Sequence, residues 1–232
     1  MTSISIFGVR GRMGQAIADE AEFREDVKIG EIKPDVFIDF SACEALEEHL
    51  EAAVAAEKPI LIGTTGLTAD HHRMIDEAAA KIAVIQAANT SLGVILLAHL
   101  VREAASRLKS SWDIEVVEMH HRLKADAPSG TALLLGKAAA EARGTTLDAV
   151  AVRGRDGMTG PREPGTIGFA ALRGGTVAGD HHVIFAAEGE RLELTHRAES
   201  RAVFARGAVD AALWLVGKPA GRYSMADVLG LK

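Results

Sequence analysis

The first ninety residues alternate short apolar runs with longer stretches of helical composition. The apolar runs are "ISIFGV" at 4–9, "VFIDFS" at 36–41, "PILIGTT" at 59–65 and "IAVIQAA" at 82–88. The intervening stretches, rich in Ala, Glu and Leu, cover 12–23, 42–56 and 69–80. Near-continuous apolar runs are typical of strands that helices cover on both faces, and Ala, Glu and Leu favour helices. The pattern therefore predicts βαβ units around a parallel sheet.

The pattern changes after residue 90. A helix is predicted at about 91–108, a strand in "WDIEVVEMHH" at 112–121 and another helix at 129–142. Three β-rich runs joined by glycine-containing turns follow: "TIGFAALRGG", "HHVIFAAEGE" and "RLELTHRAES". A last helix is predicted at 203–216, with helical character continuing through the tail to Leu231. This order favours a second domain of α+β type with an antiparallel or mixed sheet.

Length and charge narrow the class of protein. A chain of 232 residues is long enough for two modest domains. A net charge of −6 without a long basic run gives little attraction to DNA or RNA. The N-terminus lacks a signal-peptide pattern, and no apolar stretch reaches the length of a membrane span. The single cysteine, Cys43, excludes an internal disulfide and a thiolate metal cluster. We expect a cytosolic protein.

A glycine-rich turn, "GVRGRMG" at 8–14, follows the first predicted strand. Glycines at this point let the backbone bend sharply and approach a pyrophosphate, while the N–H groups at the helix N-terminus face the anion. The spacing departs from G-x-G-x-x-G because Arg10 occupies the middle position. A tight turn that binds nothing is the alternative interpretation. The turn favours a Rossmann-like dinucleotide-binding domain.

Two more loops follow predicted strands of the same sheet. They are "GTTG" at 63–66 and "AANT" at 87–90. The carboxyl ends of parallel strands are where open α/β sheets bind ligands, so these loops favour a common dinucleotide site. An acid that binds the ribose is expected about 20 residues beyond the glycines, and Glu31 is the best candidate. Lys33 is the alternative, as a partner of a 2′-phosphate, so the choice between NAD and NADP stays open.

The stretch "HHRLKADAPSGT" at 120–131 gathers proton donors beside a predicted helix start. The N–H groups of Ser129, Gly130 and Thr131 are placed to hold a carboxylate or phosphate. Lys124 adds a positive charge, and a histidine within reach transfers protons near neutral pH. The stretch thus suits an anionic substrate that also receives protons. A polar loop that merely caps a helix is the alternative.

A metal site is not expected in this stretch. His120 and His121 are adjacent, so on a strand they point to opposite faces and do not readily bind one ion. Two other histidine pairs, His71–His72 and His181–His182, show that such pairs are common in this chain. We give the second pair, in the β-rich half, no substrate role.

Taken together, these motifs resemble the 4-hydroxy-tetrahydrodipicolinate reductase (dihydrodipicolinate reductase) family of bacterial lysine biosynthesis. The similarity covers nearly the whole chain, in the family's order. The strings that carry it include "GVRGRMG", "DVFIDFS", "IGTTG", "AANTSLGV", "EMHHRLKADAPSGTA", "PGTIGFAALRGG" and "GERLELTHRAESR". The segment 23–35 is shorter than in many relatives, which leaves the acid that would discriminate between the coenzymes unassigned.

The resemblance implies roles for individual residues. His120 would donate or accept a proton, and Lys124 would be the second proton donor and a carboxylate partner. The residues implied in substrate binding are His121, Ser129, Gly130, Thr131 and Arg201. The residues implied in binding NADH or NADPH are Gly8, Val9, Arg10, Gly11, Arg12, Met13, Gly63, Thr64, Thr65, Ala87, Ala88, Asn89 and Thr90.

The resemblance also implies an architecture and a reaction. Residues 1–89 with 204–232 would form the dinucleotide-binding domain, and residues 90–203 the domain that binds a small dicarboxylate and builds a homotetramer. The hydroxylated cyclic substrate would lose water, and the resulting imine would be reduced to tetrahydrodipicolinate. Two other functions are considered. One is a dehydrogenase of another small dicarboxylate, such as an amino acid, and the other is a dinucleotide sensor without turnover.

Overall fold

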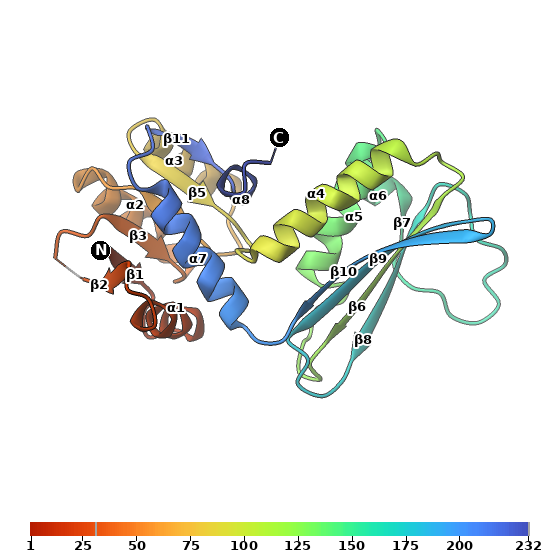
Figure 1. Ribbon diagram of the computed structural model, residues 1–232. Helices are drawn as coiled ribbons and strands as arrows, with labels where there is room; N and C mark the ends of the chain where they lie inside the picture. Colours follow the sequence, from red (N-terminus) through yellow and green to blue (C-terminus); the bar gives the residue numbers. More distant parts are fainter. Residues whose placement is uncertain (31, 232) are drawn as a thin grey trace. The chain divides into compact units, whose positions relative to one another are not determined.

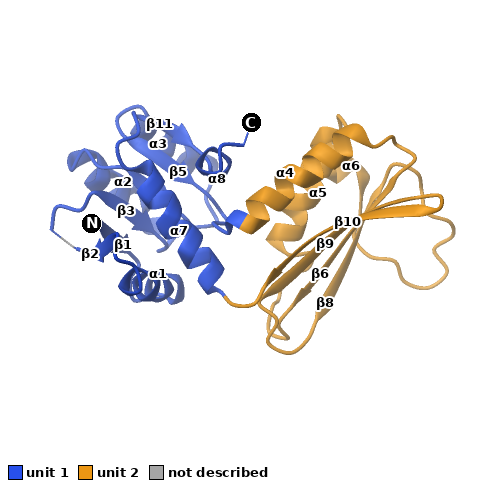
Figure 2. Ribbon diagram, viewed as in Figure 1, with its two compact units in different colours: residues 1–92, 201–232 blue, residues 93–200 orange. Residues whose placement is uncertain are grey.

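The computed structural model describes residues 1–30 and 32–231. The chain forms two compact units, residues 1–92 with 201–232 and residues 93–200 (Figure 2). A six-stranded parallel sheet organises the first unit, and a five-stranded mixed sheet organises the second. The predicted fold class is therefore confirmed.

The first unit is a Rossmann-like layer structure (Figure 1). Its strand order is β11-β5-β4-β3-β1-β2. The strands are β1 (Thr2–Phe7), β2 (Val27–Ile29), β3 (Val36–Asp39), β4 (Ile60–Ile62), β5 (Ala83–Gln86) and β11 (Gly221–Tyr223). The helices are α1 (Arg12–Glu22), α2 (Leu46–Ala55), α3 (Ala69–Ala79), α7 (Ala202–Leu215) and α8 (Met225–Val228), and a short 3₁₀ turn, η1 (Cys43–Ala45), precedes α2.

Apolar residues explain why both faces of this sheet are covered. Strands β3 and β4 are buried throughout, as expected for a sheet between two helical layers. Helices α2 and α3 pack on one face through Leu50, Ala53 and Ile75, and α7 contacts β3, β4 and β5 as well as α1. The carboxyl ends of the parallel strands therefore share one edge.

The C-terminal tail corrects the sequence analysis. Residues 221–223 form β11, which pairs in parallel with β5, where the sequence analysis predicts helical character. A three-residue strand is too short to show a period of two, so its pairing depends on contacts that the local sequence does not reveal. Only α8 in this tail is helical.

The connection between β2 and β3 is unusually short for a parallel crossover. β2 and β3 flank β1 on its two sides, and both Ile29 and Val36 pair with Ile4. β2 therefore ends at the level of β1 where β3 begins. The N–H groups of Gly30 and Asp35 donate to the carbonyls of Ile4 and Ser3 at this crossing. β2 consequently stops three residues short of the end of β1.

The second unit packs two helices on one face of its sheet (Figure 1). Strand order is β10-β9-β6-β8-β7, with β6 parallel to β8 and antiparallel to β9. The strands are β6 (Asp113–His120), β7 (Ala151–Val152), β8 (Ile167–Arg173), β9 (Gly179–Ala187) and β10 (Glu190–Ala198). The helices are α4 (Leu92–Arg107), α5 (Gly130–Ala142) and α6 (Leu147–Val150).

Alternate residues of β6 face the helices, and this face extends past the apolar core to the end of the strand. Ile114 and Val116 lie in the core against residues of α4 and α5, such as Val101 and Leu135. Glu118 and His120 follow at the same spacing, so they share this face, and both are buried. The strand therefore passes from an apolar core into a buried polar cluster at its carboxyl end.

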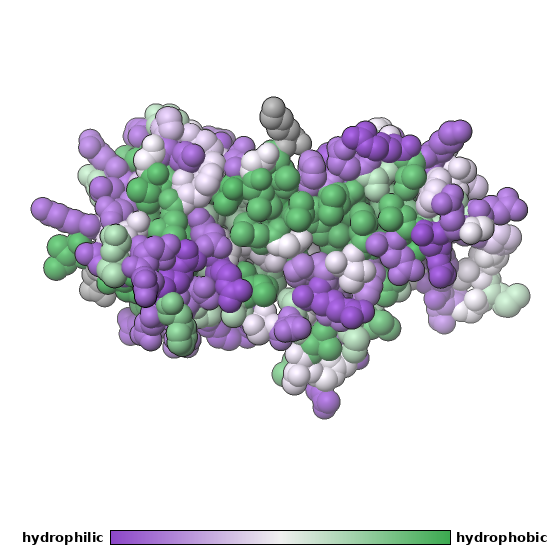
Figure 3. Space-filling view, viewed as in Figure 1, coloured by the Kyte–Doolittle hydropathy of each residue, from purple (hydrophilic) through white to green (hydrophobic). Residues whose placement is uncertain are grey.

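Helix α4 is apolar on more than its core side. Leu97 and Val101 are buried, whereas Leu96 and Leu100 are each 43% exposed. Hydrophobic residues gather over this helix in Figure 3. Among the helices in residues 1–30 and 32–231, none combines the length and the apolar character that crossing a membrane requires.

Candidate functional site

The glycine turn after β1 has the geometry of an anion cradle. Gly8 has φ +80°, and a Cβ there would lie 2.6 Å from the carbonyl oxygen of Phe40. A Cβ at Gly14 would lie 2.2 Å from the Gly8 carbonyl oxygen. Gly11 is the N-cap of α1 without any side-chain cap, and the first turn has no acidic residue. The first N–H groups of α1 are thus free of capping side chains, which fits a pyrophosphate.

Phe40 and Ser41 lie between two of the predicted loops, because β3 lies between β1 and β4. Gly8 approaches the Phe40 carbonyl, and a Cβ at Gly63 would lie 2.1 Å from Cζ of the Phe40 ring. The loops after β1, β3 and β4 therefore meet around one residue. The sequence analysis treats this residue only as the end of a strand.

Asp39 connects the loops after β3 and β4 by hydrogen bonds. Its carboxylate is fully buried at the end of β3. Oδ1 accepts hydrogen bonds from the Ser41 N–H at 2.9 Å, the Ser41 hydroxyl at 2.6 Å and the Thr64 hydroxyl at 3.1 Å. Oδ2 lies 3.1 Å from Nδ1 of His49, whose ring stacks on Phe7. The Thr64 hydroxyl is thus occupied inside the protein, while Thr65 beside it is exposed.

The loop after β5 is anchored to the same unit. The Ala87 N–H donates to the Ile62 carbonyl, and Oδ1 of Asn89 accepts from the Ser91 N–H. Thr90 is buried, and its hydroxyl donates to the Phe204 carbonyl at 2.7 Å, which ties the loop to α7. Its side chain is therefore used within the fold.

Of the two residues considered for coenzyme discrimination, only Lys33 lies within the described part of the chain. Glu31 lies outside the described residues. Lys33 is exposed and has φ +53°. Of the remaining turn residues, Val9, Arg10 and Arg12 are exposed, and Met13 is half-buried.

The second cluster surrounds Glu118 at the end of β6. Both oxygens of this buried carboxylate accept two hydrogen bonds. Oε2 accepts from Nη1 of Arg173 at 2.9 Å and faces Nδ1 of His120 at 2.6 Å. Oε1 accepts from Nη2 of Arg173 at 2.9 Å and from the Ser129 N–H at 3.1 Å. Burial raises the pKa of the Glu118 carboxyl, but the hydrogen bonds from Arg173 and His120 outweigh it, and the pKa lies below its ordinary value.

Ser129 connects this cluster to α5. It is the N-cap, with its hydroxyl accepting from the Ala132 N–H, and the same hydroxyl lies 3.1 Å from Nε2 of His181. The Ser129 N–H, assigned to an anion in the sequence analysis, already donates to Glu118. Gly130 and Thr131 are the first two residues of α5.

His181 is a member of the cluster that the sequence analysis sets aside. It is buried, its ring packs edge-on against His120 with centroids 5.0 Å apart, and Nδ1 has no hydrogen-bond partner. Burial and the neighbouring charge of His120 lower the pKa of His181 to about 4. This imidazole is therefore neutral at pH 7.

Lys124 lies in the loop between β6 and α5. Its Nζ lies 2.7 Å from Oδ1 of Asp126, and the hydrogen bond from Lys124 lowers the pKa of that carboxyl. His121 follows the end of β6 and is half-buried. Arg201 is the exposed N-cap of α7 and belongs to the other compact unit. Within residues 1–30 and 32–231, no three His, Cys, Asp or Glu side chains are placed to hold a metal ion.

A parallel sheet with a glycine-rich turn at a helix N-terminus, joined in one chain to a mixed-sheet unit with a buried cluster of imidazoles and a carboxylate, is the architecture of a dinucleotide-dependent oxidoreductase. Two family models match the chain. The model described as "Dihydrodipicolinate reductase, N-terminus" matches residues 25–90, and that described as "Dihydrodipicolinate reductase, C-terminus" matches residues 93–229. The chain belongs to the dihydrodipicolinate reductase family.

Individual relatives agree over nearly the full length. The 4-hydroxy-tetrahydrodipicolinate reductase of Zymomonas mobilis is 57% identical, covering 98% of this chain and 97% of that protein. The reductase of Caulobacter vibrioides is 48% identical, covering 99% and 97%. The alignment with the Zymomonas protein spans 247 positions, so that relative carries residues that this chain of 232 lacks.

The fold is also that of a solved family structure. The dipicolinate-bound dihydrodipicolinate reductase from Paenisporosarcina sp. TG-14 superimposes with a TM-score of 0.80, covering 98% of each chain, at 23% sequence identity. At this identity the match concerns the fold alone.

Proposed function

We propose that this chain reduces 4-hydroxy-tetrahydrodipicolinate to tetrahydrodipicolinate with NADH or NADPH, in the diaminopimelate route to lysine. The observation that carries the proposal is one short segment, 120–131, which holds a buried imidazole, a lysine and a helix N-terminus. A dicarboxylate needs cationic and N–H partners, and a reduced imine nitrogen or carbon needs a proton. This segment supplies both kinds of group.

The first unit is proposed to bind the coenzyme, with residues 1–89 and 204–232 as the dinucleotide-binding domain. The N–H groups at the start of α1 would hold the pyrophosphate, with Arg10 and Arg12 adding positive charge. Thr65 and Asn89 lie on the other two loops at the same sheet edge. A bound nicotinamide supplies the hydride. The side chains of Thr64 and Thr90 would shape these loops from within, since both are buried.

A domain of residues 90–203, which contains the second unit, is proposed to bind the substrate. The Gly130 and Thr131 N–H groups and Lys124 would take the carboxylates, with His121 and Arg201 as further partners. His120 would donate a proton through Nε2, because Nδ1 faces Glu118. Lys124 would be the second proton donor. Lys124 pairs with Asp126 in the structure, and it would release Asp126 to pair with a substrate carboxylate when a dicarboxylate binds.

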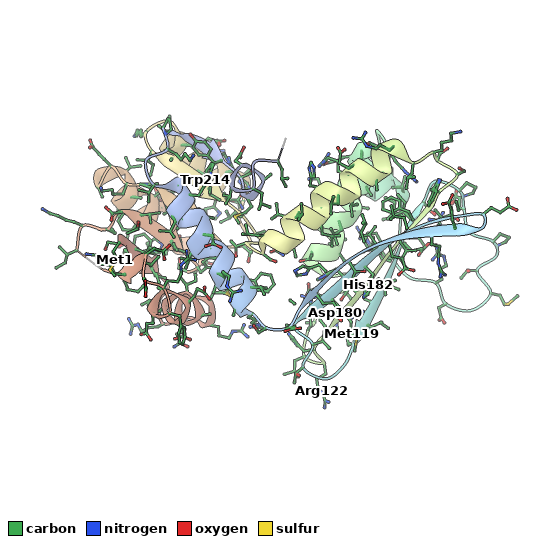
Figure 4. The ribbon with its side chains drawn as sticks, in the orientation of Figure 1. Met1, Met119, Arg122, Asp180, His182 and Trp214 are labelled. Atoms are coloured by element: carbon green, nitrogen blue, oxygen red, sulfur yellow. The ribbon has the colours of Figure 1, made fainter. Side chains whose placement is uncertain are left out.

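Assembly into a homotetramer is also proposed. The sheet face opposite α4 and α5 carries Val117, Met119, Leu172 and Ile184, which the strand register places on one side. Leu172 is 51% exposed. Figure 4 shows Met119 and His182 on the neighbouring strands of this sheet. Self-association would bury this face, and Leu172→Glu should lower the mass measured by light scattering. We place the enzyme in the cytosol, where reduced nicotinamide dinucleotides are available.

The test is the oxidation of NADH and NADPH by purified protein given freshly generated 4-hydroxy-tetrahydrodipicolinate. Rapid loss of nicotinamide absorbance is expected with the wild type. His120→Gln should lower kcat by about 100-fold, and Lys124→Ala should raise KM for the substrate and lower kcat. Lys137→Ala is the matched control, because Lys137 pairs with Glu141 on the surface of α5. Binding of coenzyme without oxidation would refute the proposal in favour of a dinucleotide sensor.

A further inference from the structure

We infer that Glu118 and Arg173 form a positioning pair, which fixes the nitrogen of His120 that exchanges protons with the substrate and holds that ring to the start of α5. The inference rests on the proposed function, since it assigns parts within the same site. Arg173 is distant in sequence from the His120–Lys124 motif, whereas Glu118 lies two residues before His120 on the same strand. Met119 and Asp180, labelled in Figure 4, mark the parts of β6 and β9 that carry His120 and His181.

The carboxylate decides the tautomer of His120. An ionised carboxylate only accepts hydrogen bonds, and Glu118 is 1% exposed with a guanidinium at 2.9 Å from each oxygen. The imidazole nitrogen that faces it at 2.6 Å must therefore carry hydrogen. Nδ1 is the donor to Glu118, and Nε2 is left as the nitrogen for proton exchange.

A missing side chain keeps Nε2 accessible. Gly179 begins β9, and a Cβ at this position would lie 3.0 Å from Nε2 of His120 and 3.4 Å from its Cδ2. The backbone there has an ordinary conformation, so the glycine is not needed for a left-handed turn. Glycine at 179 leaves space at the one nitrogen that Glu118 does not engage.

Arg173 favours the ionised form of Glu118 and also contacts the loop between β6 and α5. The two parallel N–H···O bonds fix the plane of the carboxylate. Nη2 of the same guanidinium donates to the carbonyl of Asp126, in the loop that also carries Lys124. One arginine on β8 therefore sets the position of the acceptor for His120 and of the loop that holds the proposed second proton donor.

Ser129 couples the pair to the helix. The fourth hydrogen bond to Glu118 comes from the Ser129 N–H, and the Ser129 hydroxyl meets the neutral His181. All four acceptor positions of the carboxylate are thus filled, from two strands, β6 and β8, and the start of helix α5. A shift of Glu118 would therefore move both the His120 ring and the start of α5, where Gly130 and Thr131 are proposed to bind a carboxylate.

The direct test is ¹⁵N NMR of the imidazoles in the full-length chain at about pH 8, where an ordinary histidine is neutral. His120→Gln identifies the resonances. The wild type is expected to show hydrogen on Nδ1 of His120, and in Glu118→Gln Nδ1 should no longer be the preferred position. Glu115→Gln is the matched control, because Glu115 lies on the same strand and pairs with Arg155 and Arg162 without touching a histidine.

Kinetics provide the second readout. Glu118→Gln should lower kcat by about 100-fold while KM for NADH stays within about twofold, and Glu115→Gln should leave both unchanged. Gly179→Ala should lower kcat without changing the tautomer. A wild-type His120 that carries hydrogen on Nε2 and none on Nδ1 would overturn the inference even if no variant folds, and so would a Glu118→Gln enzyme no slower than Glu115→Gln. A wild type inactive with the substrate would refute the proposed function instead, whereas the tautomer would still decide the inference.

Discussion

Each compact unit buries one carboxylate at its candidate site, and the two are satisfied by different partners. Asp39 in the first unit accepts from two hydroxyls, one backbone N–H and the half-buried His49. Glu118 in the second unit accepts from a guanidinium, a buried imidazole and one N–H. Mainly neutral donors suit a carboxylate that holds loops in shape, whereas a cation and an imidazole suit one that serves proton transfer. We propose that the two carboxylates, although similarly buried, serve these two different roles.

The largest expected difference is in stability. Glu118→Ala leaves the Arg173 guanidinium without its counter-charge, and such a loss typically costs about 3–5 kcal/mol of unfolding free energy. Asp39→Ala leaves mainly hydroxyls unpaired, at about 1–3 kcal/mol. Urea denaturation of both variants measures the two values. The double variant Glu118→Met with Arg173→Met should recover part of the loss. If Glu118→Ala and Asp39→Ala lost the same unfolding free energy, the two buried carboxylates would not differ in the strength of their partners.

His181 makes the second cluster sensitive to pH. Its pKa in the folded chain, about 4, lies below its ordinary 6.5, so the unfolded chain takes up the proton first as pH falls. Stability is therefore full above pH 6.5 and declines toward pH 4 by about 3 kcal/mol. His181→Gln should flatten this dependence in urea denaturation at several pH values. His182→Gln, on the opposite face of β9, is the control, and a slope unchanged in His181→Gln would contradict the assignment.

The first cluster should instead respond to packing. Gly63→Ala places a methyl group against the Phe40 ring, at about 1–3 kcal/mol, and should weaken NADH binding because both loops move. Isothermal calorimetry measures the affinity. Combining it with Phe40→Leu should restore part of the stability. A Gly63→Ala protein with unchanged stability and affinity would show that these loops are not tightly packed.

The smallest effect is expected at the surface of the second site. Asp126→Asn removes the partner that holds Lys124 in the absence of substrate. Exposed ion pairs contribute little, so KM for the substrate should fall by only about two- to threefold. Steady-state kinetics at fixed NADH measure this. A rise in KM would indicate that Asp126 orients Lys124 for the substrate.

The sequence predicts the long elements and the fully buried strands of both units well, and the partly exposed short strands poorly. Runs such as 36–41 and 59–65 are apolar because helices cover both faces, and that burial is visible locally. Strands β2 and β11 have three residues each and are exposed or half-buried at most of them, so neither an apolar run nor a period of two marks them. Their pairing with β1 and β5 depends on the sheet as a whole.

The residues of the candidate site also differ in how well the sequence reveals them. His120, Lys124 and Ser129 lie in one segment, so their type and spacing point to proton transfer. Arg173 and His181 come from β8 and β9 and meet Glu118 only in space. Glu118 itself carried a usable signal, because the period of two that places Ile114 and Val116 in the core also places Glu118 and His120 on that face.

The most direct test of these two roles compares Asp39→Asn and Glu118→Gln in the same two measurements, the dissociation constant of NADH and the single-turnover rate of reduction at saturating coenzyme and substrate. Asp39→Asn should raise the dissociation constant about tenfold and leave the rate within about twofold. Glu118→Gln should lower the rate about 100-fold and leave the dissociation constant within about twofold. If both variants changed the same quantity, the division of roles between the two buried carboxylates would be wrong.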